Sequence, residues 1–140
     1  GAVGPIFTLR GAELGCIVAY KVIEMLQRPD LRGNVAAVTD FMQGAMAQMV
    51  ERHGDIFTGV RQKGVILGLE FGHSGENAVA VSRALYENGV WAIFSSLDKR
   101  VLQWKPGLLL SPDLCREIME RFDTAMPRAR ELLHAASKAR

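Results

Sequence analysis

Histidine, cysteine and glycine residues are the first candidates for chemistry in this chain, because their spacing can reveal metal, nucleophile or phosphate sites. The three histidines, His53, His73 and His134, lie far apart in the sequence. No pair of them has metal-ligand spacing with a cysteine or carboxylate. We therefore expect no metal site.

The two cysteines, Cys16 and Cys115, both fall in helical apolar patterns. Such a pattern predicts a buried pair of reduced thiols, and a buried thiol tends to be inert as a nucleophile. Reduced thiols also favour a reducing compartment, so we expect a cytoplasmic protein. No base, nucleophile and metal set converges in the sequence, and we assign no catalytic residue.

Two glycines, Gly64 and Gly68, are spaced as in some phosphate-binding loops. The segment lacks the Gly-Lys-Ser/Thr ending of such loops, and no helix follows it directly. We interpret Gly64 as a turn residue and Gly68 as a strand residue where a neighbour packs closely.

The composition is that of an ordinary globular domain. The chain has 140 residues, 17 Lys and Arg against 15 Asp and Glu, and a net charge of +2. This balance argues against nucleic acid as the main partner, since nucleic-acid-binding domains usually carry a concentrated basic face. No run approaches the roughly 20 apolar residues of a membrane span, so no membrane partner is expected.

Apolar residues recur at helical spacing in four stretches. These run from Ala12 to Arg28, from Asp30 to about His53, from Asn77 to Asn88, and from Ser111 to the C-terminus. The first stretch is expected to turn inward Leu14, Ile17, Val18, Val22 and Met25. Ser111-Pro112-Asp113 is a clear helix start, with a capping hydroxyl, a proline and a carboxylate in order. Pro127 is expected to kink or interrupt the last helix.

Strand-like runs occupy the middle of the chain. They are Ile56–Arg61, Val65–Phe71, Val90–Ser95 and Val101–Lys105. The element order α-α-β-β-α-β-β-α predicts an α+β fold in which helices pack on a small, mostly antiparallel sheet. We expect an irregular N-terminal segment over residues 1–11 and a single small domain over residues 12–140.

Three motifs resemble the C-terminal small domain of class III (fold type I) pyridoxal-phosphate-dependent aminotransferases. Residues 7–16 resemble the family stretch Thr-Phe-x-Gly-Asn-Pro-Leu-Ala-Cys, with Ala12 and Glu13 in place of Asn-Pro. Residues 60–70 resemble Val-Arg-Gly-x-Gly-Leu-Met-x-Gly-x-Glu, with Gln62 in place of a glycine. Residues 101–108 resemble Val-Leu-Arg-x-x-Pro-Pro-Leu. The likeness covers about residues 7 to 133.

The resemblance implies a transaminase that works as a cytoplasmic homodimer with pyridoxal 5'-phosphate and exchanges an amino group between a small amine or amino acid and a keto acid. Thr8 matches the threonine whose hydroxyl binds the cofactor phosphate of the neighbouring subunit. Gln103 stands where many members have an arginine that clamps a substrate carboxylate. Glutamine cannot form that ion pair. We therefore expect one of two outcomes in the complete enzyme. Either its substrate is an amine that lacks this carboxylate, or Lys105 binds the carboxylate with a less directional charge. The alternative is that the side chain at position 103 only packs in the strand or faces solvent.

The resemblance also implies that part of the enzyme lies elsewhere. The family's Schiff-base lysine and the acidic partner of the pyridine nitrogen lie upstream, on a large cofactor-binding domain of the same polypeptide. None of the five lysines here matches that lysine, so the chain alone is expected to be inactive. Two other interpretations stay open from the residues: a stand-alone, non-enzymatic α+β binding or regulatory module, and a self-contained small-molecule enzyme.

Overall fold

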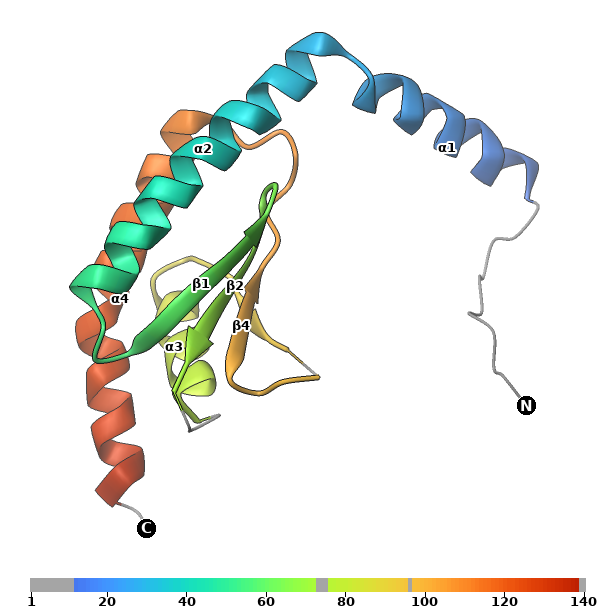
Figure 1. Cartoon of the computed structure of the whole chain (residues 1–140). Coiled ribbons are helices and arrows are strands. Elements are labelled where there is room, and N and C mark those ends of the chain that lie inside the picture. Colours follow the sequence, from blue (N-terminus) through green and yellow to red (C-terminus); the bar gives the residue numbers. More distant parts are fainter. Residues whose placement is uncertain (1–11, 73–75, 96, 139–140) are drawn as a thin grey trace. The chain divides into compact units, whose positions relative to one another are not determined.

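The computed structural model describes residues 12–72, 76–95 and 97–138, and it confirms the α+β fold (Figure 1). In chain order the elements are α1 (Glu13–Leu26), α2 (Pro29–Arg52), β1 (Phe57–Lys63), β2 (Ile66–Phe71), α3 (Glu76–Glu87), β3 (Ile93–Phe94), β4 (Val101–Trp104) and α4 (Pro112–Lys138). This is the predicted order of helices and strands.

The chain forms two compact units, one ending at Gly33 and one running from Asn34 to Arg140. The second unit holds the sheet and the hydrophobic core. Because residues 1–11 lie outside the described part, the predicted division into an irregular segment and one domain stays a prediction.

The four strands form one sheet in the spatial order β1-β2-β4-β3, and each neighbouring pair is antiparallel. A hairpin joins β1 to β2 around Gly64, whose φ of +56° lies in the left-handed region that favours glycine. Gly68 lies in β2, where an added Cβ would stand 3.2 Å from Cγ1 of Val101. Both glycine interpretations are thereby confirmed.

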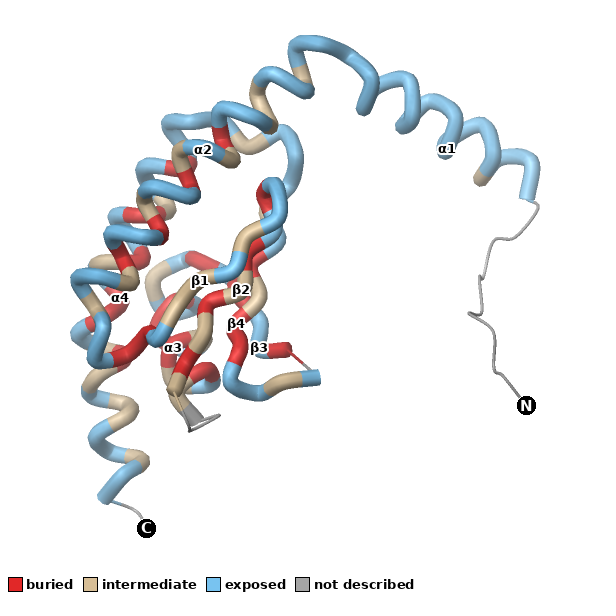
Figure 2. Tube along the Cα trace, in the orientation of Figure 1, coloured by how far each residue is buried: buried red, intermediate tan, exposed pale blue. Residues whose placement is uncertain are grey.

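The two faces of this sheet are unlike. In β2, Leu67, Leu69 and Phe71 are buried, whereas the residues that alternate with them are exposed or half-buried. The buried side packs on helices of the same unit: the ring of Trp104 in β4, for example, meets the ring of Phe122 in α4 edge-on, with centroids 6.0 Å apart. Figure 2 shows buried residues recurring along α2 and along the strands. The other side, which we call the open face, carries charged side chains such as Arg61 and Glu70 together with exposed apolar ones such as Ile66.

The last helix confirms its predicted start but not its predicted interruption. Pro112 begins α4, and the Ser111 hydroxyl accepts a hydrogen bond from the Leu114 N–H at 3.2 Å. The helix then continues through Pro127 to Lys138. Phe122 and Ala129, before and after the proline, are fully buried. Packing of this stripe outweighs the hydrogen bond that proline cannot make.

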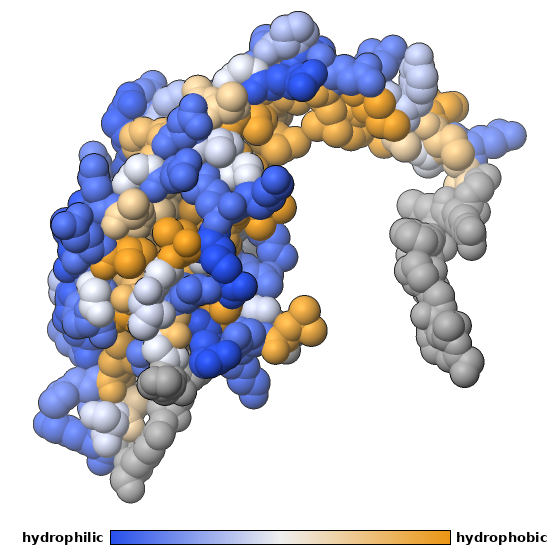
Figure 3. All heavy atoms as spheres, in the orientation of Figure 1, coloured by the Kyte–Doolittle hydropathy of each residue, from blue (hydrophilic) through white to orange (hydrophobic). Residues whose placement is uncertain are grey.

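The expected inward face of α1 is a wrong prediction. No residue of α1 is buried, and Leu14 and Ile17 are 75% and 66% exposed. Cys16, predicted to be buried, is exposed as well, while Cys115 is buried and burial raises the pKa of its thiol. Figure 3 shows apolar side chains gathered along this helix. The helical spacing correctly predicted that the apolar residues share one face of α1. Spacing alone does not reveal whether another part of the protein packs on that face.

The third strand is shorter than predicted, because backbone groups of its expected first half bond to α3. The N–H of Val90 donates to the Leu85 carbonyl at 2.9 Å, and the Ala92 carbonyl accepts from the Ser82 hydroxyl at 2.7 Å. In the later half, Ile93 and Phe94 pair with β4, and the Ser95 N–H donates to the Val101 carbonyl at 2.8 Å.

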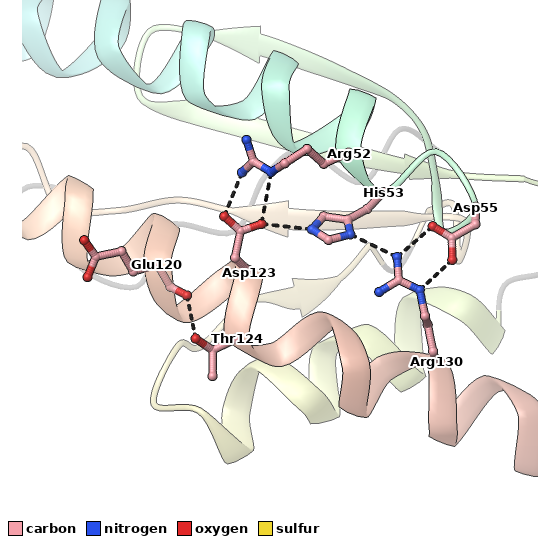
Figure 4. A network of polar contacts seen from close by, with 7 residues as sticks. All are labelled: Arg52, His53, Asp55, Glu120, Asp123, Thr124 and Arg130. Carbon is pink, nitrogen blue, oxygen red and sulfur yellow. Dashed lines mark hydrogen bonds and ion pairs between the residues drawn. The ribbon is translucent and has the colours of Figure 1, made fainter.

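A polar network joins the end of α2 and the start of β1 to α4 (Figure 4). His53 Nε2 lies 2.9 Å from Asp123 Oδ1, and Arg130 Nη2 lies 3.0 Å from His53 Nδ1. A guanidinium can only donate, so Nδ1 accepts and the neutral imidazole carries its proton on Nε2. Arg130 also pairs with both carboxylate oxygens of Asp55, at 2.7 and 2.8 Å. Both imidazole nitrogens are engaged, so the network connects the end of α2 to α4.

The conformation of Gly89 yields a stability prediction. Its φ is +78°, and an added Cβ would lie 2.6 Å from Nη1 of Arg121. Gly89→Ala should lower the free energy of unfolding by about 1 kcal/mol. Gly44→Ala adds the same methyl to exposed space in α2 and should raise that free energy by up to about 1 kcal/mol. Urea unfolding measures both, and changes of the same sign would contradict this account.

The pair of Arg130 with Asp55 yields a pH prediction. The guanidinium holds the pKa of the Asp55 carboxyl below its ordinary value, so the pair's stabilisation is present above the unfolded pKa and is lost as the pH falls through the folded one. Asp55→Asn should therefore cost at most about 1 kcal/mol near pH 7, since the pair is half exposed. The cost should begin to shrink below about pH 4 and should vanish once the pH lies below the lowered pKa of the folded state. Asp40→Asn, an exposed change on α2, is the control in denaturant titrations, and a pH-independent cost for Asp55→Asn would contradict the assignment.

Candidate functional site

The pairing of the strands brings a row of residues across the open face of the sheet. Arg61 of β1 pairs with Gly68 of β2, and Gly68 pairs in turn with Gln103 of β4. Gln103 also pairs with Ile93 of β3. Directly paired residues of antiparallel strands point to the same face. Gln103 and Arg61 thus share the open face, with only a glycine between them.

A second row lies one step nearer the hairpin turn. Lys63 pairs with Ile66, and the pairing of Leu67 with Trp104 sets the register that brings Lys105 beside Ile66. Lys63 and Lys105 therefore flank Ile66 from opposite sides. Their Cα atoms are two strand spacings apart, which is about 10 Å.

These two rows border a shallow groove of about 410 Å³ on the open face. We call it the basic groove; its principal lining residues are Arg61, Lys63, Ile66, Gly68, Gln103 and Lys105. The floor is mostly apolar, and the lining includes three cations and no carboxylate. A smaller hollow of about 220 Å³ also touches Gln103 and Lys105, and it adds Trp91 and Ile93.

The neighbouring hollow differs in its charge. It has a volume of about 340 Å³, and there Arg61 pairs with Glu70 while Arg100 pairs with both oxygens of Asp98. The Arg100 guanidinium lowers the pKa of the Asp98 carboxyl. These charges satisfy one another. By contrast, no carboxylate of the described residues lies within 4 Å of the ammonium groups of Lys63 or Lys105.

The structure brings two of the three predicted site residues together. Gln103 is half-buried and Lys105 is exposed, and both line the basic groove; their substrate role stays a prediction. Thr8 lies outside the described residues, so its assignment also stays a prediction. Sequence reasoning missed Arg61 and Lys63 as groove residues. Their opposition to Gln103 and Lys105 depends on β2 pairing with β4, which local sequence patterns do not reveal.

Gln62, where the family motif has a glycine, supports the hairpin. Its amide nitrogen donates to the Thr39 carbonyl of α2 at 2.9 Å and to the Gly64 carbonyl of the turn at 2.8 Å. A glycine could form neither bond. The side chain thus fixes the turn, and with it the neighbouring Lys63, to the helix below the sheet.

Neither a metal site nor a membrane-spanning helix occurs among the described residues. Over residues 12–72, 76–95 and 97–138, no group of three or more His, Cys, Asp or Glu side chains could hold a metal ion. In the same part of the chain, no helix has both the length and the apolar character to span a membrane.

The family model for class III aminotransferases matches residues 4–126. An uncharacterised aminotransferase of Archaeoglobus fulgidus is 29% identical over 121 residues, which are 86% of this chain and 28% of that protein. The acetylornithine aminotransferase of Rhodobacter capsulatus is 30% identical over 84% of this chain and 29% of its own length. The crystal structure of N-acetylornithine aminotransferase from Stenotrophomonas maltophilia is 23% identical, superposes with a TM-score of 0.66, and is matched over 31% of its length.

The similarity to the solved structure supports the fold, and the match to the family model is the evidence for the family. The chain spans less than a third of the length of these relatives. The match covers α1, α2, α3, all four strands and the first part of α4. The chain belongs to the class III aminotransferase family.

Proposed function

We propose that the chain is the C-terminal small domain of a class III aminotransferase that transfers an amino group between an amine or amino acid and a keto acid. The observation that carries this proposal is the family match over residues 4–126, in one continuous order. Enzymes of this family depend on pyridoxal 5'-phosphate, which supplies an electron sink for the amino-transfer chemistry. The rest of the proposed enzyme is a large cofactor-binding domain of the same polypeptide, and the proposed working form is a cytoplasmic homodimer.

The described residues fit a substrate-binding role better than a cofactor-binding role. A lysine that forms an imine with the cofactor needs a desolvated pocket that lowers its pKa. All five lysines of the chain lie among the described residues, and each of them is exposed. We infer that the Schiff-base lysine belongs to the large domain, and we derive no covalent step from this chain.

The basic groove is the proposed substrate-facing part of the domain. Gln103 offers an amide that can donate and accept hydrogen bonds, and Lys105 adds a mobile positive charge beside it. Thr8 is proposed to donate its hydroxyl to the cofactor phosphate of the neighbouring subunit. The support for Thr8 is the resemblance of residues 7–16 to the family motif.

The isolated chain should form no imine with the cofactor. Mixed with pyridoxal 5'-phosphate, it should show no stoichiometric shift of the aldehyde absorbance and no single lysine labelled after borohydride reduction. Absorbance spectroscopy and peptide mass spectrometry measure these two outcomes. Stoichiometric reduction onto one lysine, together with turnover of an amino donor, would overturn the proposal that this chain is only part of the enzyme.

Restoring the arginine should change substrate preference in the full-length enzyme. Gln103→Arg should raise kcat/KM for amino acids relative to amines about tenfold, because a bidentate arginine–carboxylate pair is a strong charge-assisted interaction. Gln43→Arg adds the same charge on an exposed part of α2 and should leave the ratio unchanged. An unchanged ratio for Gln103→Arg would show that position 103 does not face the substrate.

A further inference from the structure

We propose that the basic groove binds an organic acid with an apolar body, whose acid group lies between Lys63 and Lys105 and whose carbon chain lies on the groove floor. This inference rests on the proposed function and specifies its substrate class. The ligand chemistry follows from two features of the groove, its unbalanced charge and its apolar floor.

The groove has positive charge without a carboxylate partner at one place, beside Ile66. Arg61 is paired with Glu70, which lines the neighbouring hollow and not the groove. Lys63 and Lys105 stand on opposite sides of Ile66, and among the described residues no carboxylate is within ion-pair distance of either. Two flexible lysine stems about 10 Å apart at Cα can both reach an anion above the residue between them. The position next to Ile66 is therefore favourable for a negative group.

The floor of the groove selects for an apolar body. Ile66 is 53% exposed on the open face, and Gly68 beside it has no side chain. The space above Gly68 is bordered by Arg61 and Gln103, and by Cγ1 of Val101, which would lie 3.2 Å from an added Cβ. A short hydrocarbon chain placed there would be shielded from water, and so would the apolar floor beneath it. An inorganic anion would gain the charge of the lysines but nothing from the floor.

Gln103 completes the specificity at the far end of the floor. Its neutral amide adds a hydrogen-bonding partner without a third unpaired positive charge. A ligand therefore meets two unpaired cations at one end, and at the other end the Gln103 amide opposite Arg61, whose charge is paired with Glu70. This arrangement suits one acid group and an apolar chain that ends in a hydrogen-bonding substituent.

The experiment is an NMR titration of the full 140-residue chain with hexanoate, without the cofactor. Hexanoate should bind saturably with a Kd in the millimolar range and shift the amide signals of Gly68 and Gln103. Hexanamide, which has the same chain without the charge, and inorganic phosphate, which has charge without the chain, should each bind several-fold more weakly. Lys63→Gln and Lys105→Gln should each weaken hexanoate binding about threefold, as expected for exposed ion pairs.

Lys138→Gln removes an exposed lysine at the end of α4, outside the groove, and should leave hexanoate binding unchanged. Hexanamide binding as tightly as hexanoate would overturn the role of the lysines, and phosphate binding as tightly would overturn the role of the floor. Absence of saturable hexanoate binding would overturn the whole proposal. None of these results depends on imine formation or turnover, so an active isolated chain would overturn the proposed function and leave this binding result standing.

Discussion

Alternation along β2 and β4 is the constraint on which the rest of the structure depends. The helices can cover the sheet only if Leu67, Leu69 and Leu102 point toward them, and all three are fully buried. Because strand side chains alternate, Gly68 and Gln103 then have to lie on the other face. A slip of one residue would move the polar groups into the core and the apolar ones into water. The hydrophobic core therefore determines which residues line the basic groove.

The turn between β1 and β2 transmits this constraint to the groove. Gly64 supplies the left-handed conformation of the turn, and Gln62 bonds the turn to the Thr39 carbonyl of α2. Lys63 lies between these two residues, so its position depends on the turn geometry and on the bond from Gln62 to α2. The polar network around His53 holds the C-terminal end of the same helix against α4. The site thus depends on contacts in the middle and at the C-terminal end of α2.

Much of the fold could be predicted because helical and strand periods are local properties of the sequence. The inward stripe of α4, for example, contains Cys115, Phe122 and Met126, and all three are buried as expected. The incorrect predictions concern which segments contact one another, not the helical or strand spacing of the apolar residues. The apolar residues of α1 have the right spacing, yet they are exposed. The run from Val90 to Ser95 has strand-like residues, but α3 takes the backbone groups of Val90 and Ala92.

The candidate site was predictable only in part for the same reason. Gln103 and Lys105 could be identified because a family motif includes their positions. Arg61 and Lys63 belong to another motif some forty residues earlier in the chain. Nothing in that motif reveals that β2 alone separates them from β4, because the sheet order places β4 beside β2 and sends β3 to the edge. Long-range strand order was the missing information.

The exposure of the groove limits what its charges can do in this chain alone. Two unit charges 4 Å apart attract by about 1 kcal/mol in water and by about 4 kcal/mol at the effective dielectric constant of a protein surface. Lys63 and Lys105 are exposed here, so their attraction for an anion lies near the lower value. In the proposed enzyme, a large domain that closes over the groove would exclude water and strengthen the same charges without moving them. On this argument the small domain provides the pattern of charge and apolar surface, and the covering domain determines how strongly that pattern discriminates between substrates.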